Sequence, residues 1–416
     1  MWLSRRGMFP LATEIIKKRV LFVGEDNELW LQLSEQWHGP ESEWEPAFAL
    51  TASQALSWIG QSSFDALVVD VDVRGMEAEQ LLNKVMDAHP QMLRFIRSKL
   101  AAHYATLKWA GSVHRHLMKP CDAQTVQAAL SSAFKLKGWL PAEGIQTLIT
   151  QVRRLPSPPR LYLRVASALK SPDASVQTIG ALISEDPALS AKVLQLANST
   201  VFGLQLHVSH PAEAVAFLGM ELTRSLVLAA HTFSFFEQLT PLQFSIDQLC
   251  RHSLVTGLFA QWIAQSEKVD SEMEGQAFAA GMLHDLGKLV LAANLPEPFG
   301  QAIKLAREQA IPLWEAEITI LKGSHAEVGA WLLGTWGLPI PIVEAVALHH
   351  RPTRLLSSSF SPLTAVHVAN VFEHEGRYQD SSGCSVDSAY LNELGLSDRV
   401  EEWRGICLDR LEARAA

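Results

Sequence analysis

The chain has 416 residues, of which 48% are hydrophobic and 19% are charged, and its formal net charge is −9 at pH 7. This length exceeds what one ordinary hydrophobic core uses and predicts two or three domains. The acidic balance, without a basic block, counts against binding to a phosphate backbone, so we expect no specific nucleic-acid partner.

The ends of the chain and its few cysteines bear on location. The four cysteines form no CxxC pair, which favours a reducing compartment, and we expect a cytoplasmic protein. Residues 1–16 are basic but lack the apolar segment of a signal peptide, so we interpret them as an N-terminal extension. No apolar run approaches the roughly 20 residues of a membrane span, and we expect no membrane association. Whether the chain is a monomer or a homodimer stays open.

Residues 17–136 alternate between strand-like and helix-like patterns. Short apolar runs lie at residues 20–23, 67–69, 93–96 and 116–118. Between them, residues 78–88 place Leu81, Leu82 and Val85 on one face, which predicts a helix. Alternation at this spacing predicts a doubly wound parallel sheet of the flavodoxin-like type.

Polar residues follow each predicted strand. Glu25 and Asp26 follow the first, Asp70 the second, Ser98 the third and Lys119 the fourth. The carboxyl ends of parallel strands meet at one edge of a sheet, so these side chains are expected together. A carboxylate nucleophile, acidic ligands for Mg²⁺, a lysine and a hydroxyl are what phosphoryl transfer to an aspartate requires.

Residues 17–136 resemble the receiver domain of response regulators. Residues 64–70, which read FDALVVD, are similar to the strand that carries the phospho-acceptor, and Lys119-Pro120 to the family's Lys-Pro pair. The resemblance implies a sensor histidine kinase or a phosphotransfer protein as partner. It also implies roles for single residues: Asp70 as phospho-acceptor assisted by Lys119 and Ser98, and Mg²⁺ held by Glu25, Asp26 and Asp70.

Two alternatives stay open for this region. The acidic pair can also be aligned as Gly24 and Glu25, which removes one acid. Arg74 and Ala78 stand where the family usually has Pro and Gly after the acceptor. The region is then a degenerate receiver, folded but not phosphorylated.

Helical periodicity dominates the rest of the chain. We expect a linker at 137–145, an all-helical domain at 146–350, and a C-terminal helical extension at 351–416 that is weakly helical from Val400. Asp186 as N-cap and Pro187 at the first helical position predict a helix that runs to about Asn198.

Histidines recur along this helical region together with one aspartate. Imidazole and carboxylate are good ligands for divalent transition metals, so the sequence predicts a metal site. His284 and Lys288 are four residues apart, which predicts a shared helix face. The candidate ligands are His252, His284, Asp285, His325, His349 and His350.

Residues 146–350 resemble the HDOD family, the HD-related output domain. The motifs that carry the resemblance occur in order at residues 155–159 (LPSPP), 185–189 (EDPAL), 194–199 (LQLANS), 202–203 (FG), 214–215 (AV) and 218–219 (LG). The resemblance implies a signalling module that acts by protein interaction. Together with the receiver, it predicts a two-component response regulator in which phosphorylation of Asp70 controls binding to an unknown downstream protein.

The resemblance to HD enzymes also bears on the metal site. Asn370 stands where those enzymes have a last aspartate ligand, so we expect Asp285 as the only carboxylate in the ring and one metal of structural or regulatory role. The alternative is an HD-type phosphohydrolase or cyclic-dinucleotide phosphodiesterase gated by the receiver. Arg351-Pro352 in place of the Gly-Tyr-Pro signature leads us to lean against an enzyme.

Overall fold

The structure is a computed structural model whose residues group into two compact units, Met1–Ser131 and Ser132–Ala416. It describes residues 17–39, 41–89, 92–98, 115–139, 148, 160–169, 171, 173–202, 208–237, 245–355, 359–377 and 385–415. The expected extension at 1–16, most of the expected linker at 137–145, the motif at 155–159 and Gly203 lie outside these residues.

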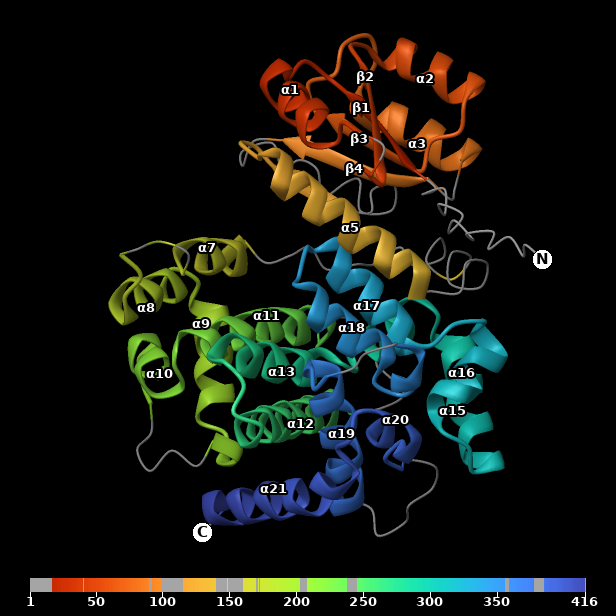
Figure 1. The fold of residues 1–416 in the computed structure, drawn as a ribbon. Helices are drawn as coiled ribbons and strands as arrows, with labels where there is room; N and C mark the ends of the chain where they lie inside the picture. Colours follow the sequence, from red (N-terminus) through yellow and green to blue (C-terminus); the bar gives the residue numbers. More distant parts are fainter. Residues whose placement is uncertain are drawn as a thin grey trace, which may run out of the picture. The chain divides into compact units, whose positions relative to one another are not determined.

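The first unit is built on one parallel sheet with the strand order β2-β1-β3-β4-β5 (Figure 1). This order is common among doubly wound α/β folds, so the predicted parallel sheet is confirmed. Its elements are β1 (Lys18–Val23), α1 (Asn27–Gln36), β2 (Trp44–Ala49), α2 (Ala52–Gln61), β3 (Ala66–Asp70), α3 (Ala78–Ala88), β4 (Leu93–Ser98), β5 (Arg115–Met118) and α5 (Ala123–Trp139).

Apolar side chains cover both faces of this sheet, because successive strand residues point to opposite sides. On one face, Leu67 of β3 and Ile96 of β4 share a core cluster with Leu81 of α3. On the other face, the ring of Phe22 in β1 lies 5.9 Å from that of Trp37, which follows α1. The polar residues that follow the strands therefore lie at the carboxyl edge of the sheet, outside this apolar packing.

The edge strand β2 was missing from the predicted runs. Its sequence, WEPAFA, is interrupted by Glu45 and Pro46, which break the apolar signal. Proline is tolerated there because an edge strand pairs on one side only.

The second unit is helical in every part that the structure describes. None of its helices, nor any described helix of the first unit, combines the length and apolar character needed to cross a bilayer. Its elements are α7 (Arg160–Ala168), α8 (Val176–Ser184), α9 (Pro187–Ala197), η2 (Thr200–Phe202), α10 (Pro211–Leu218), α11 (Met220–Glu237), α12 (Ile246–Ser266), α13 (Ser271–Leu283), α14 (Leu286–Asn294), α15 (Pro296–Gln309), α16 (Leu313–Leu321), α17 (His325–Thr335), α18 (Ile340–Leu348), η3 (Pro352–Arg354), α19 (Pro362–Arg377), α20 (Ser388–Glu393), η4 (Ser397–Arg399) and α21 (Val400–Ala415).

Local capping explains two features of α9. Asp186 accepts the backbone N–H of Leu189 at 3.0 Å, and Pro187 is the first helical residue, as predicted. At the other end, the amide of Asn198 donates to the carbonyl of Val208 at 2.7 Å and accepts its N–H at 2.8 Å. Asn198 thus ties the end of α9 to the chain that leads into α10.

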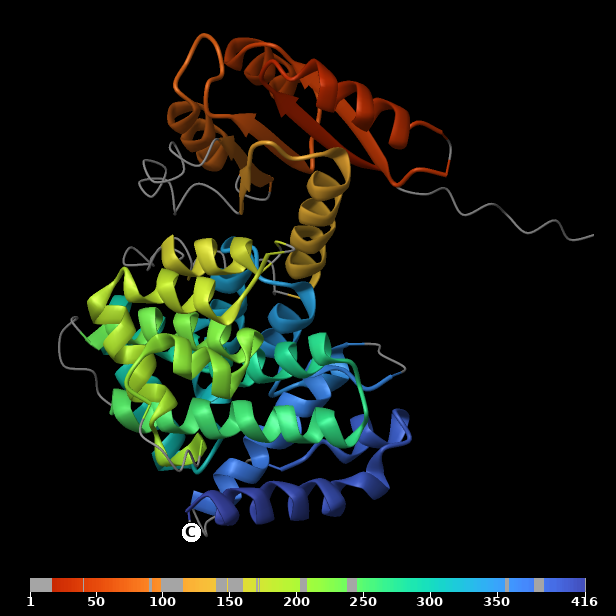
Figure 2. The same cartoon turned by 90° about the vertical axis from the view of Figure 1, so that its left-hand side faces the viewer.

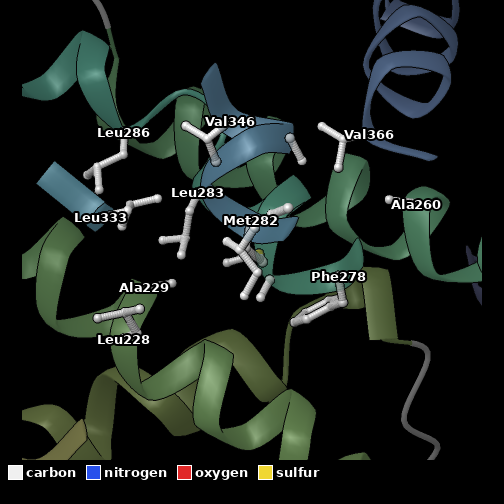
Figure 3. Close-up of a cluster of buried hydrophobic side chains, with 14 of the residues drawn as sticks. Leu228, Ala229, Ala260, Phe278, Met282, Leu283, Leu286, Leu333, Val346 and Val366 are labelled. Atoms are coloured by element: carbon white, nitrogen blue, oxygen red, sulfur yellow. The ribbon is translucent and has the colours of Figure 1, made fainter. Parts of the chain in front are cut away.

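The core of this unit lies where α11, α12, α13, α14, α17, α18 and α19 meet. Figure 3 shows Leu228, Met282, Leu283, Leu286 and Leu333 directed into it, and all of them are buried. Burying each such side chain contributes about 1.5–3 kcal/mol. These contacts fix the helices whose ends carry the candidate metal ligands.

The C-terminal helix α21 belongs to the same packed body. It lies beside α12 in both views (Figure 1, Figure 2). Trp403 is fully buried, and its indole N–H donates to Glu267 at 2.9 Å. The weak helical signal from Val400 is therefore a real helix that completes the core.

Two close helix approaches depend on glycine. A Cβ on Gly281 of α13 would lie 2.6 Å from the Cα of Gly257 in α12, and a Cβ on Gly287 of α14 would lie 1.9 Å from the carbonyl oxygen of His325. No larger residue fits either contact. These approaches bring the turn at His284 and Asp285 close to α12 and α17.

Candidate functional site

The carboxyl edge of the parallel sheet brings Asp70 and Lys119 together. Asp70 ends β3 and is 4% exposed, and Lys119 Nζ lies 2.8 Å from its Oδ2. The peptide bond between Lys119 and Pro120 is cis. Gly24, with φ +154°, closes β1 so tightly that a Cβ there would lie 2.4 Å from Asp70 Oδ2. The expected acceptor and lysine therefore meet at one point.

The two acids of the predicted pair point to different partners. Asp26 Oδ1 accepts the backbone N–H of Leu29 at 3.1 Å and caps α1. Glu25 forms an ion pair with Arg74 at 2.9 Å, between two side chains that are substantially exposed. Ser98 is fully buried at the end of β4.

Arg97, which no motif singled out, lies between Asp26 and Asp70. Its Nη2 is 2.5 Å from Asp26 Oδ2, its Nη1 is 3.2 Å from Asp70 Oδ1, and its side chain is 2% exposed. Burial acts to lower the pKa of Arg97, but the charge of Asp70 and the hydrogen bond to Asp26 outweigh it and raise that pKa. Because a guanidinium already contacts both carboxylates, the expected Mg²⁺ ion does not fit while Arg97 is in this position.

A pocket of about 790 Å³ opens beside this group, between α1 and the start of α5. Asp26, Lys119 and Cys121 are among its lining residues. The polar edge of the sheet therefore borders a pocket large enough for a small molecule.

All six ligands predicted in the helical unit come together, five of them at helix ends and one within a helix. His252 lies within α12, His284 follows α13, Asp285 precedes α14, His325 begins α17, and His349 and His350 follow α18. They form two groups that share Asp285: one with His325, His349 and His350, the other with His252 and His284. Within each group the ligand atoms lie within 4.8 Å of one another.

Hydrogen bonds on the far side of the rings direct the Nε2 atoms inward. His284 Nδ1 lies 2.7 Å from the carbonyl of Gly281, and His349 Nδ1 lies 2.8 Å from that of Val346. A carbonyl only accepts, so each Nδ1 carries the hydrogen and each neutral ring keeps a lone pair on Nε2. Burial lowers the pKa of His284 to about 3 and that of His349 well below its usual value, so both rings stay neutral.

Two buried glutamates support the ring from outside. Glu373 of α19 lies 2.5 Å from His252 Nδ1, and Glu317 of α16 lies 2.6 Å from His325 Nδ1. Asp285 is the one carboxylate among the grouped ligand atoms of the described residues, and the two glutamates add negative charge behind the ring that the expectation left out. Both glutamates contact the outer nitrogen of a histidine and do not face the centre of the cluster. They are not part of the motifs that pointed to the other ligands. Carboxylates in that position orient metal-binding imidazoles and raise their basicity.

The three carboxylates determine the charge of the cluster. Lys288 Nζ pairs with Asp285 Oδ2 at 2.6 Å. Burial acts to lower the pKa of His325, but the charge of Glu317 outweighs it and raises that pKa. When all the imidazoles are neutral, Glu317, Glu373 and Asp285 leave two negative charges against this one lysine, which one divalent cation would neutralise.

Lys288 and Asn370 lie beside this cluster, and the structure corrects the expectation about Lys288. His284 and Lys288 do not share a helix face, because the chain turns at His284-Asp285 between α13 and α14. Asn370 lies on α19, one helical turn before Glu373 and so on the same face. It is buried, and its Oδ1 has no hydrogen-bond partner.

The donor set fits a divalent transition metal. His349 Nε2 and Asp285 Oδ1 are buried and make no hydrogen bond. Neutral imidazoles with one carboxylate are ligands that such ions prefer. Asp285 with His325, His349 and His350, or Asp285 with His252 and His284, would hold the ion, which would stabilise the junction of these helices.

The comparisons with known proteins match the helical unit. Residues 155–352 match the family model of the HDOD domain. The chain therefore contains an HDOD domain. Within the matched residues, Asp186 caps the start of α9 and Asn198 ties its end to the chain that leads into α10.

Two individual proteins are similar to this chain over part of its length. A crystal structure of an HDOD domain protein with unknown function from Geobacter sulfurreducens is 23% identical and covers 70% of this chain and 98% of that chain, with a TM-score of 0.54. An uncharacterized protein from Treponema pallidum (strain Nichols) is 28% identical over 204 residues, 49% of this chain. The match spans 39% of that relative's length.

A third comparison concerns the first unit. The signal receiver domain of an HD domain-containing protein from Pseudomonas fluorescens Pf-5 is 23% identical and covers 31% of this chain and 96% of that chain, with a TM-score of 0.27.

Proposed function

We propose that the chain is a cytoplasmic response regulator. In it, the parallel-sheet unit is the receiver and the HDOD domain is the output. The observation that carries the proposal is the contact of 2.8 Å between Lys119 Nζ and Asp70 Oδ2 at the carboxyl edge of the sheet. A buried carboxylate held beside a fixed cation suits a nucleophile that becomes an acyl phosphate.

The reaction assigned to Asp70 is a simple displacement. A carboxylate oxygen of Asp70 attacks the phosphorus of a phosphohistidine, or of a small acyl phosphate such as acetyl phosphate. A P–O bond forms to Asp70 as the bond from phosphorus to the histidine nitrogen, or to acetate, breaks. Lys119 offsets the charge of the phosphoryl oxygens. The donor is thus a sensor histidine kinase, a phosphotransfer protein or a metabolite.

The output is proposed to be a change in protein interaction. Phosphorylation adds charge and strong acceptor oxygens, which biases a two-state element, and the HDOD domain would present a different surface to its downstream partner. The histidine cluster would hold one divalent ion that stabilises this domain, because the charge of the cluster suits one ion.

The test uses acetyl phosphate and a gel that retards phosphoproteins. The wild-type chain should give a retarded band that the Asp70→Asn chain does not. The Asp72→Asn chain is the control, since Asp72 is an exposed acid two residues further on, and it should behave as wild type. Equal retardation of the wild-type and Asp70→Asn chains would refute the assignment.

A second candidate function is metal-dependent phosphoester hydrolysis in the HDOD domain. The inward-directed Nε2 atoms beside Asp285 favour it, because HD-type hydrolysis uses such ligands. Assays with bis(p-nitrophenyl) phosphate and cyclic dinucleotides test it. Turnover that is lost in Asp285→Ala would promote this function over the interaction role.

A further inference from the structure

One arginine occupies the position between the two acids of the sheet edge. Arg97 is the register partner of Asp70 in the parallel pair of β3 and β4. Its guanidinium spans the gap to Asp26, which follows β1, so one side chain links groups from three strands. With 2% of its side chain exposed, Arg97 cannot rely on water to stabilise its charge.

Strand β4 contains a second buried arginine, whose surroundings differ from those of Arg97. Arg94 is 5% exposed and donates to the carbonyl of Met92 at 2.8 Å. Burial lowers the pKa of Arg94 to about 10, whereas the pKa of Arg97 is raised. Arg97 contacts the carboxylates of Asp26 and Asp70 directly.

We infer that Arg97 is the resident cation of this pocket and competes with a divalent cation for Asp26 and Asp70. The inference depends on the proposed receiver function at one point, because it takes Asp70 to be the phospho-acceptor. Carboxylate oxygens are the ligands that Mg²⁺ takes from a protein, and the ion demands close, near-octahedral contacts. Asp26 Oδ2 and Asp70 Oδ1 cannot make them while Arg97 lies 2.5 Å and 3.2 Å away.

The contact with Asp70 is weak enough to be released. Asp70 Oδ1 makes no hydrogen bond despite its short distance from Arg97 Nη1, and Arg97 Nε also has no partner. Arg97 is thus held to Asp70 by charge and to Asp26 by a short hydrogen bond. Removing this side chain frees two carboxylates at once and removes a positive charge beside the ion.

The experiment is calorimetric titration of Mg²⁺ into three full-length chains: wild type, Arg97→Met and Arg94→Met. Only binding that Asp26→Asn removes is counted, so that ions taken up elsewhere do not contribute. Arg97→Met should bind Mg²⁺ at least about tenfold more tightly than wild type, because a like charge within a few ångströms opposes the ion. Arg94→Met is the matched control and should bind as wild type does.

Equal affinity of the wild-type and Arg97→Met chains would overturn the inference. If Arg97→Met fails to fold, as judged by circular dichroism, the wild-type titration still decides. A dissociation constant below about 1 mM that Asp26→Asn abolishes would contradict a pocket already filled by Arg97.

The proposed function fails in a different way. An Arg97→Met chain that gains Mg²⁺ but is not phosphorylated at Asp70 by acetyl phosphate would remove the receiver role and leave the competition intact. If the wild-type and Arg97→Met chains bind Mg²⁺ equally and Asp70 is phosphorylated, the competition is refuted and the receiver role stands.

Discussion

The Nε2 atoms of His252 and His284 lie 3.0 Å apart, so two buried imidazoles direct ring nitrogens at each other. Glu373 lies at Nδ1 of the first ring and the carbonyl of Gly281 at Nδ1 of the second. Both hydrogens are thereby placed on the outer nitrogens, and two lone pairs face inward. Such a contact needs a proton or a metal cation between the two atoms.

The first prediction concerns metal content. Chains purified without chelator should hold one divalent transition metal each. His284→Ala should lose most of this metal, because alanine offers no atom that can replace the imidazole ligand. Elemental analysis measures this directly. His210→Asn is the control, since His210 is an exposed capping residue of α10. Two ions per wild-type chain, or full metal content in His284→Ala, would contradict the single-ion site.

The second prediction concerns the outer carboxylates. Glu373→Gln keeps the shape of the side chain but removes the charge that orients His252, so metal affinity should fall about 10–100-fold. Competition with a chromophoric chelator gives the affinity. Glu274→Gln changes a glutamate at a partly buried contact with Gln265 and should leave it unchanged. Unaltered affinity in Glu373→Gln would show that the carboxylate has no role in binding.

The third prediction concerns the close approach of α14 to α17. Gly287→Ala would place a Cβ 1.9 Å from the carbonyl of His325, so the helices must separate. We expect a loss of about 3 kcal/mol in the unfolding free energy of the helical unit, measured by urea denaturation. Gly405→Ala, where nothing lies within 4 Å of the added Cβ, should be neutral or slightly stabilising. Equal effects of the two changes would refute the packing argument.

The fourth prediction concerns Asn198. Asn198→Ala leaves the buried N–H and carbonyl of Val208 without their partner, which should cost about 2 kcal/mol in the same denaturation experiment. Asn198→Asp keeps the acceptor but places a carboxylate oxygen against the carbonyl oxygen of Val208, so it should destabilise the chain at least as much. An Asn198→Ala chain as stable as wild type would show that this motif residue is retained for another reason.

The sequence predicted much of this architecture because its strongest signals are local. Apolar runs marked four of the five strands, and the capping pair Asp186-Pro187 marked the start of α9. The strand β2 was missed because Pro46 breaks its pattern and the strand needs partners on one side only.

The candidate sites show where such reasoning ends. The histidines were found because they stand in motifs, whereas Glu317 and Glu373 reach the rings only through tertiary packing. The one available hint for Glu373 was its spacing of three residues from Asn370 on a predicted helix. Arg97 stands between the predicted run at 93–96 and Ser98 and was assigned no role, and only the register of β3 with β4 sets it opposite Asp70.

The central claim is that the state of Asp70 controls the HDOD domain, and hydrogen–deuterium exchange tests it most directly. Exchange of peptides from residues 155–352 is compared with and without acetyl phosphate, in the wild-type, Asp70→Asn and Asp72→Asn chains. We predict that acetyl phosphate changes exchange in this region in the wild-type and Asp72→Asn chains only. No change in any chain, or the same change in Asp70→Asn, would contradict the claim.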